Sequence, residues 1–229
     1  RLNMESYMMG RKLNCIGIIL IILSLLLSQV ESKIDIKNSD KRFLLFISLN
    51  TFTASDKLTS LISELEYSIK QGDHPFDKVI YGYVSVFLSA YYHKNKAYSQ
   101  AAQTIKKAFF YLDEVVEQNP TNWRLIYLRL RMDAFTPRYL GRCVVAKKDS
   151  QQLLENININ SELIPMINYM YARALFSCEQ VTQAKKIMAQ LLQENEASKK
   201  IARYSFTSVP PWLSIEKTAV IQPITLESD

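Results

Sequence analysis

Arginine and aromatic side chains crowd into one short stretch near the middle of the chain. Its members are Trp123, Arg124, Tyr127, Arg129, Arg131, Arg138, Tyr139 and Arg142. A guanidinium makes planar, bidentate contacts with carboxylates, so arginine suits the recognition of acidic groups. Arg124 and Arg131 are seven residues apart and share one face of a helix. The stretch predicts a basic strip that grips an acidic partner or a chain-terminal carboxylate. The candidate contacts are Trp123, Arg124, Tyr127, Arg131 and Arg138.

A structural role for the same arginines stays open. Arg129 and Asp133 are four residues apart and form a potential ion pair on a helix. Arginine stems also cover apolar surface while the charged head stays in water. Nucleic-acid binding uses basic and aromatic residues as well. A formal net charge of +6 over 229 residues is low for a nucleic-acid-binding protein, so we expect no nucleic-acid partner.

Two cysteines, Cys143 and Cys178, follow the N-terminal region. A lone pair of cysteines in an oxidising compartment is a natural disulfide. Closing the 35-residue interval between them stabilises a fold by roughly 4 kcal/mol in the chain-entropy description. The alternative is two buried thiols on neighbouring helices, because free cysteine packs as a small hydrophobe.

Residues that could support catalysis or bind a metal are sparse. His74 and His93 lie in turns without cysteine or acidic residues at ligand spacing, so we expect no metal site. The sequence has no H-E-x-x-H, G-x-S-x-G, G-x-G-x-x-G or P-loop motif. We therefore expect a protein without a cofactor and without catalytic activity. A helical hydrolase remains an alternative, because its two carboxylates can be far apart in sequence.

The N-terminal region has the pattern of a targeting segment. Arg11 and Lys12 precede an apolar run at 15–27, which is shorter than the ~20 residues of a membrane span. Val30 and Ser32 are small enough for the −3 and −1 positions of a cleavage site before Lys33. We expect a signal peptide at 1–32, whose removal gives a secreted or periplasmic chain. The alternative is an uncleaved anchor over residues 13–30 in the inner membrane.

Helical periodicity dominates from about residue 40 onward. Glycine is rare, at about 2% of residues against a usual ~7%, which disfavours tight turns and phosphate-binding loops. The spacing of apolar residues predicts helices at 97–118 and 123–135. It also predicts a restart at Thr136-Pro137 with a break at 147–150. We expect an all-α domain at 33–206. A tail at 207–229 contains Pro210, Pro211 and Pro223 and should be extended.

Two stretches resemble the tetratricopeptide repeat (TPR), in which antiparallel helices form hairpins. The first, at 76–120, carries Leu88, Ser89, Tyr92, Tyr98, Ala101, Ile105 and Ala108 at the repeat's spacings. The second, at 169–195, carries Ala172, Leu175, Val181, Ala184, Met188 and Leu191. Ala101 and Ala184 are 83 residues apart, which is not a multiple of 34, so the middle of the array should be irregular. The alternative is a compact helical bundle.

The resemblance implies a right-handed array of helical hairpins that holds peptides or partner proteins. Together with the signal peptide, it predicts a non-catalytic scaffold or adaptor of the bacterial envelope. The partner would be a protein or peptide, and an acidic one if the arginines contact it. Contact with the membrane would occur only through an uncleaved N-terminal segment.

Overall fold

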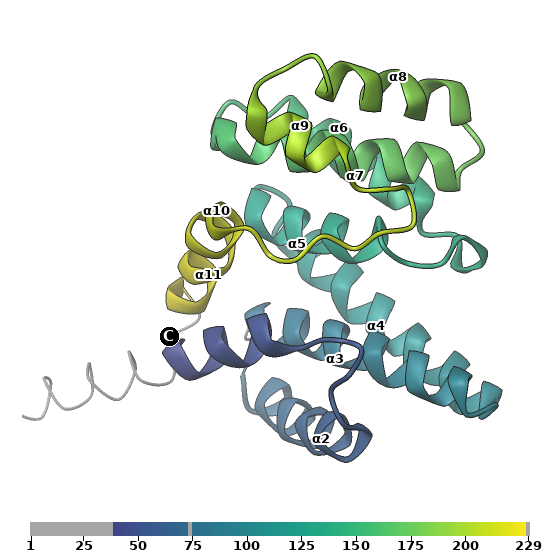
Figure 1. Ribbon diagram of the computed structural model, residues 1–229. Coiled ribbons are helices and arrows are strands. Elements are labelled where there is room, and N and C mark those ends of the chain that lie inside the picture. Colours follow the sequence, from purple (N-terminus) through teal and green to yellow (C-terminus); the bar gives the residue numbers. More distant parts are fainter. Residues whose placement is uncertain (1–38, 73–74, 228–229) are drawn as a thin grey trace, which may run out of the picture.

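The computed structural model of the chain describes residues 39–72 and 75–227 (Figure 1). Every regular element in these residues is a helix and none is a strand, so the predicted all-α fold class is confirmed. The expected signal peptide or anchor at 1–32 lies outside the described residues. Within residues 39–72 and 75–227, no helix combines the length and the apolar character that crossing a bilayer takes.

The helices pack in sequential pairs. A helical segment at 39–48 comes first. The longer helices after it are α2 (Ser55–Gln71), α3 (Pro75–Lys94), α4 (Tyr98–Gln118), α5 (Trp123–Asp133), α6 (Cys143–Leu154), α7 (Ile164–Ser177) and α8 (Val181–Leu191). α3 packs on α4, α5 on α6 and α7 on α8. Figure 1 shows α3, α5 and α7 one above the other, so that these three helices form one layer.

The α3–α4 and α7–α8 turns are built in the same way. Each has one residue in the left-handed region, Lys96 (φ 61°) in the first and Glu179 (φ 65°) in the second. The next residue then donates its N–H to a carbonyl five positions back, from Ala97 to Tyr92 at 2.9 Å and from Gln180 to Leu175 at 2.8 Å. Such left-handed caps end helices tightly. The two stretches that resemble the repeat thus have hairpin turns of the same geometry.

Small residues lie where α3 and α4, and α7 and α8, approach each other. Ala101, Ala108, Ala172 and Ala184 are buried, as is Leu88. The Ser89 hydroxyl donates to the Ala101 carbonyl across the first hairpin at 2.9 Å. Tyr92 and Ile105 are half-buried.

Tyr98 differs from the other residues at the repeat's spacings in the first stretch. It is 59% exposed and does not pack between the helices, although a repeat-packing residue was expected there. It begins α4, and its ring rests on His93 at the turn, with the ring centres 5.5 Å apart. The first turn of α4 lies at the end of the hairpin, where the ring is open to solvent.

The middle of the chain departs from the other hairpins. The helix expected to restart at Thr136-Pro137 is only a 3₁₀ turn, η1 (Arg138–Leu140), and α6 begins later at Cys143. Pro137 is extended (ψ 139°) and Gly141 is left-handed (φ 73°), so neither continues a helix. The break expected at 147–150 does not occur. Asp149 and Ser150 face inward instead, and the Ser150 hydroxyl donates to the Ala146 carbonyl.

Residues 203–227, the strap, cross the layer of α3, α5 and α7 after the short helix α9 (Glu196–Ala202). The strap forms turns at 203–207 and is extended at 208–213 (Figure 1). It then forms α10 (Ser214–Glu216), the π-helical turn η3 (Lys217–Ile221) and α11 (Gln222–Glu227). The prediction of an extended tail at 207–229 is therefore wrong from 214 to 227. Val220 and Ile221 are buried in the common core, so the strap belongs to the same domain.

Gly82 allows α3 and α4 to approach closely. A β-carbon at Gly82 would lie 2.5 Å from Cγ of Leu112, which is fully buried in α4. We expect Gly82→Ala to lower the free energy of unfolding by about 1–3 kcal/mol, although alanine favours a helix by about 1 kcal/mol. Urea denaturation measures this. Lys94→Ala, at an exposed position of α3, is the control and should change stability by less than about 0.5 kcal/mol. Equal stability of the two variants would contradict the close approach.

Candidate functional site

Arg131 on α5 is the centre of the contact between the helices and the strap. Its side chain is 4% exposed and lies between two rings, 4.5 Å from the centre of Trp212 and 4.9 Å from that of Phe135. Nη2 donates to the carbonyls of Pro210 at 2.9 Å and Pro211 at 3.3 Å. The guanidinium therefore binds the main chain of the strap and also stacks on its only tryptophan.

Glu216 supplies the counter-charge from the strap. It is fully buried, and its Oε1 lies 2.7 Å from Arg131 Nε. The Tyr127 hydroxyl donates to the same oxygen at 2.9 Å, and the Leu213 N–H donates to Oε2 at 2.8 Å. Burial raises the pKa of Tyr127 well above its ordinary value, and the Glu216 charge raises it further. Tyr127 thus stays a protonated donor to the carboxylate.

A second pair of donors on α7 holds the turn at 205–208, which leads into the extended part of the strap. The Tyr169 hydroxyl lies 2.7 Å from the Ser205 carbonyl and 3.1 Å from that of Ser208. Arg173 donates from Nη1 to the Ser208 carbonyl at 2.6 Å and from Nε to the Ala134 carbonyl at 3.0 Å. Tyr127, Arg131, Tyr169 and Arg173 together form what we call the strap site. Its hydrogen bonds to residues 205–211 go to main-chain carbonyls.

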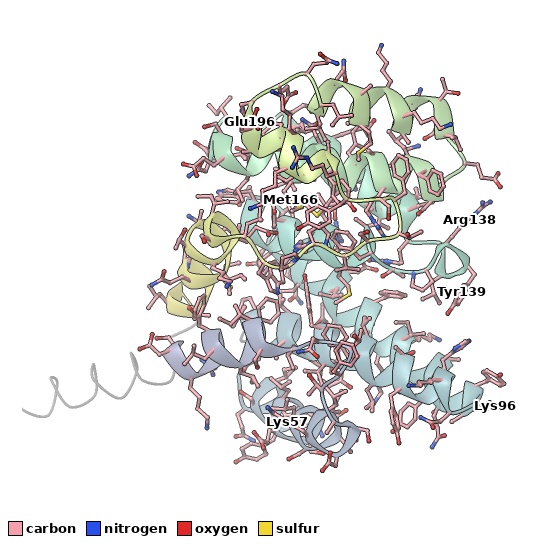
Figure 2. All side chains as sticks on the ribbon, in the orientation of Figure 1. Lys57, Lys96, Arg138, Tyr139, Met166 and Glu196 are labelled. Atoms are coloured by element: carbon pink, nitrogen blue, oxygen red, sulfur yellow. A yellow bond between two sulfur atoms is a disulfide. The ribbon has the colours of Figure 1, made fainter. Side chains whose placement is uncertain are left out.

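The predicted contact residues divide into two groups. Arg124 donates from Nε to the Ala219 carbonyl of the strap at 3.0 Å and stacks on Trp123 with 4.7 Å to the ring centre. Arg124 therefore lies at the strap with Tyr127 and Arg131, and Trp123 packs against Arg124. Arg138 does not lie at the strap: it is exposed and pairs with Glu179 at the α7–α8 turn. Figure 2 shows Arg138 beside Tyr139 on the loop that projects between α5 and α6.

Four residues of this arrangement were not among the predicted contacts: Tyr169, Arg173, Trp212 and Glu216. Tyr169 and Arg173 are four apart on α7, where the other residues from Ile167 to Leu175, except Asn168 and Tyr171, are buried and apolar. An arginine on such a face is a signal for a buried polar contact. Glu216 carries no comparable signal, because one acidic residue in a tail looks like any solvated side chain.

Trp212 also ties the strap to the start of the fold. Its ring centre lies 5.7 Å from that of Phe46 in the helical segment 39–48 and 6.3 Å from that of Tyr83 in α3. Tyr83 is buried and donates its hydroxyl to the Leu128 carbonyl of α5 at 2.8 Å. The strap therefore bridges the first helices and the middle of the array.

The remaining arginines of the cluster join α4, α5 and α6. Arg129 binds both oxygens of Asp149 at 2.8 Å and approaches Asp113 at 3.3 Å. Arg142 binds Asp113 at 2.7 and 2.8 Å, and Asp133 twice at 2.8 Å. The expected Arg129–Asp133 pair along one helix is thus replaced by pairs between helices. These two arginines are engaged inside the fold and are not part of the strap site.

The predicted cysteine pair is joined. Cys143 at the start of α6 and Cys178 after α7 form a disulfide with a Cα–Cα distance of 5.7 Å. Of the two alternatives, the structure therefore has the disulfide. It closes the α6–α7 pair, whose connecting segment includes the 3₁₀ turn η2 (Ser161–Leu163).

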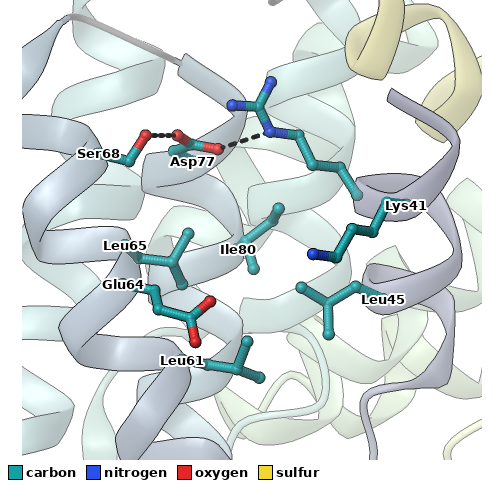
Figure 3. A pocket seen from close by; sticks show the side chains of 9 residues that line it. Lys41, Leu45, Leu61, Glu64, Leu65, Ser68, Asp77 and Ile80 are labelled. Carbon is teal, nitrogen blue, oxygen red and sulfur yellow. Dashed lines mark hydrogen bonds and ion pairs between the residues drawn. The ribbon is translucent and has the colours of Figure 1, made fainter. Parts of the chain in front are cut away.

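A cavity of about 290 Å³ lies between the helical segment 39–48, α2 and α3 (Figure 3). Asp77 at its wall is buried, accepts a hydrogen bond from the Ser68 hydroxyl and pairs with Arg42 at 3.4 Å. Lys41 and Glu64 also line the cavity. The carboxylate of Asp77 is held by two donors, which is a structural arrangement.

Metal ligands do not gather in the part of the chain that the structure describes, where no group of three His, Cys, Asp or Glu could hold an ion. His93 lies against the rings of Tyr98 and Tyr139. His74 lies outside the described residues.

Comparisons with protein-family models, with curated proteins and with solved structures found no match. Function therefore has to be inferred from the residues and their geometry.

The buried carboxylates give stability a defined pH dependence. Burial raises the pKa of Asp133 to about 7 from an ordinary 3.8, although hydrogen bonds from Arg142 lower it. Between these values the folded chain binds a proton that the unfolded chain has released. The free energy of unfolding should therefore fall as pH rises from about 4 to 7, by up to about 1.4 kcal/mol per pH unit.

Asp133→Asn should flatten this dependence in urea denaturation at about pH 4.5, 6 and 7.5. Glu117→Gln, at an exposed position of α4, is the control and should keep the slope of the parent. A full slope in Asp133→Asn would show that Asp133 does not carry it.

Proposed function

We propose that this chain is a non-catalytic scaffold or adaptor of the bacterial periplasm or envelope, which binds a partner protein or peptide through a TPR-like array of helical hairpins. The observation that carries the proposal is the strap site. Three of its side chains, on α5 and α7, hold a non-helical segment through main-chain carbonyls from Ser205 to Pro211. Recognition of main-chain groups by a fixed row of donors is a common mode of peptide binding.

The hairpin turns support the TPR-like description. The turns at Lys96 and Glu179 have the same left-handed residue and the same hydrogen bond. They fall in the two stretches whose residue spacing resembles the repeat. A hairpin array offers a long face for a partner, because each helix pair adds to the same layer.

Two features support a location outside the cytoplasm. The first is the apolar run at 15–27 with basic residues before it. The second is the Cys143–Cys178 disulfide, since such bonds persist in oxidising compartments. A scaffold that keeps residues 13–30 as an anchor is the alternative location, and the two differ in the N-terminus of the exported chain.

Export and processing can be tested in a bacterial host that expresses the chain. We expect the protein in the periplasmic fraction with Lys33 as its first residue, measured by N-terminal sequencing. Val30→Asp should block cleavage, because a signal-peptidase cleft takes a small residue at −3. Asn38→Asp adds the same charge downstream of the site and is the control, which should be cleaved like the parent. An intact N-terminus in the membrane fraction would favour the anchored scaffold instead.

Partner binding can be tested by photo-cross-linking from defined positions in the same host. A benzophenone amino acid at Val209, which is 64% exposed on the strap, should give a discrete product of higher mass. Phe110, 59% exposed on α4, is the control position and should give none. The product should disappear when unlabelled parent protein is overexpressed as a competitor. Equal products from both positions would contradict a partner at the strap, and so would the absence of any product.

A further inference from the structure

The strap is held at its centre by a small set of polar contacts around one side chain. Arg131 contacts Pro210, Pro211, Trp212 and Glu216. Val209, which is 64% exposed, and Pro211 are open to solvent beside this contact, whereas Trp212, Leu213 and Ile215 pack against the core. The main chain of residues 205–211 is held by hydrogen bonds to Arg131, Tyr169 and Arg173, which the carbonyls of a competing segment can also accept.

The fit of the strap to Arg131 is incomplete. Nη1 and Nε of Arg131 are buried and have no hydrogen-bond partner among the described residues, although Glu216 Oε1 lies 2.7 Å from Nε as an ion pair. A buried charged donor without an acceptor is costly, because it loses its contact with water and gains nothing in return. Glu216 reaches Nε through one oxygen, while its other oxygen accepts from Leu213. An occupant whose carboxylate or carbonyl also reached Nη1 would bind this site better than the strap does.

The contacts define what such an occupant must look like. Its main chain turns where Tyr169 and Arg173 reach the carbonyls of the strap and is extended where Arg131 reaches them. It has an aromatic residue to cover the guanidinium face that Trp212 covers. It has a carboxylate four residues later, where Glu216 meets Arg131.

We propose that the strap is an exchangeable occupant of the strap site, and that the site binds in its place an extended acidic peptide of the partner protein, with an aromatic residue four positions before a carboxylate. This inference rests on the proposed scaffold function and names the chemistry of the partner. In the absence of the partner, the strap covers the arginines and keeps the site closed.

The two occupants compete for the same donors, so weakening the strap opens the site. Glu216→Gln removes the charge that pairs with Arg131 and leaves the side chain the same size. Loss of one member of a buried, hydrogen-bonded charge pair weakens a contact strongly. The Glu216→Gln protein, in which the strap is held less tightly, should therefore bind an added peptide more tightly than the parent protein does.

The test uses the full chain with Trp123→Phe, so that Trp212 is its only tryptophan. In this background Glu216→Gln should shift Trp212 emission to longer wavelength as the ring leaves Phe46 and Tyr83 for water. A fluorescein-labelled peptide of residues 205–227 is the probe, and its anisotropy gives the affinity. It should bind the Glu216→Gln protein at least about tenfold more tightly than the parent.

Two comparisons make the test specific to the strap site. Val209→Ala, at an exposed position of the strap, should bind the probe like the parent. Adding Arg131→Lys to Glu216→Gln should abolish the gain, because lysine lacks the planar fork. Thermal melts of both proteins establish that the array is folded. A probe with Gln at its position 216 should bind less tightly than the unaltered probe.

Three results would overturn the inference. One is unchanged Trp212 emission in Glu216→Gln, because Glu216 would then not hold the strap. Another is an opened strap with no tighter binding of the probe than of a scrambled peptide. The third is a dimer of Glu216→Gln in sedimentation, which would assign the site to the strap of a second copy. A cross-link from Val209 to a partner could still be observed with each of these results. The scaffold proposal can therefore stand or fail independently of this inference.

Discussion

Burial of the Arg131 guanidinium is the constraint on which the arrangement of the chain depends. A charged group that leaves water needs acceptors and a counter-ion around it. In the described part of the chain, the polar contacts of Arg131 are the carbonyls of Pro210 and Pro211 and the carboxylate of Glu216. All of them come from the strap and not from α3, α5 or α7. The C-terminal segment lies across the helices where it satisfies Arg131, and contacts with Tyr169 and Arg173 fix its course farther along.

The rest of the array is joined by polar contacts where the hairpins are least regular. The α5–α6 connection is longer than the α3–α4 and α7–α8 turns and contains η1 and Gly141. Across this part, Arg129 and Arg142 bind aspartates from α4, α5 and α6, and the disulfide joins the start of α6 to the end of α7. Charge pairs between helices fix relative position more narrowly than apolar contacts, which tolerate sliding. These contacts hold α6 in place where no tight turn does so.

The sequence carried much of the local structure but little of the long-range structure. Periodicity located α4 and α5, which match the helices predicted at 97–118 and 123–135 within two residues. The small residues Ser89, Ala101 and Ala184 identified two of the hairpin contacts correctly. The restart at Thr136-Pro137 and the extended tail were wrong, since a proline fixes only its own neighbourhood and the helical part at 214–227 begins after the paired prolines.

The same limit applies to the strap site. The spacing of Arg124, Tyr127 and Arg131 places them on one helix face, and all three contact the strap, while their contact with a partner stays a prediction. That they face residues of the same chain could not be predicted, because nothing local indicates a contact between positions 131 and 216.

The contact of Trp212 with Phe46 and Tyr83 has a consequence for the order of folding. Each hairpin contains mostly neighbouring residues, so pairs such as α3 and α4 can form as soon as both helices exist. The contacts of Trp212 join positions about 130 to 165 residues apart. Closing so long a loop costs conformational entropy, so these contacts should form after the hairpins. Until residues 205–216 have left the ribosome or a translocation channel, Arg131 has no counter-ion and the layer of α3, α5 and α7 remains uncovered. The fold can therefore be completed only after the chain has emerged as far as Glu216.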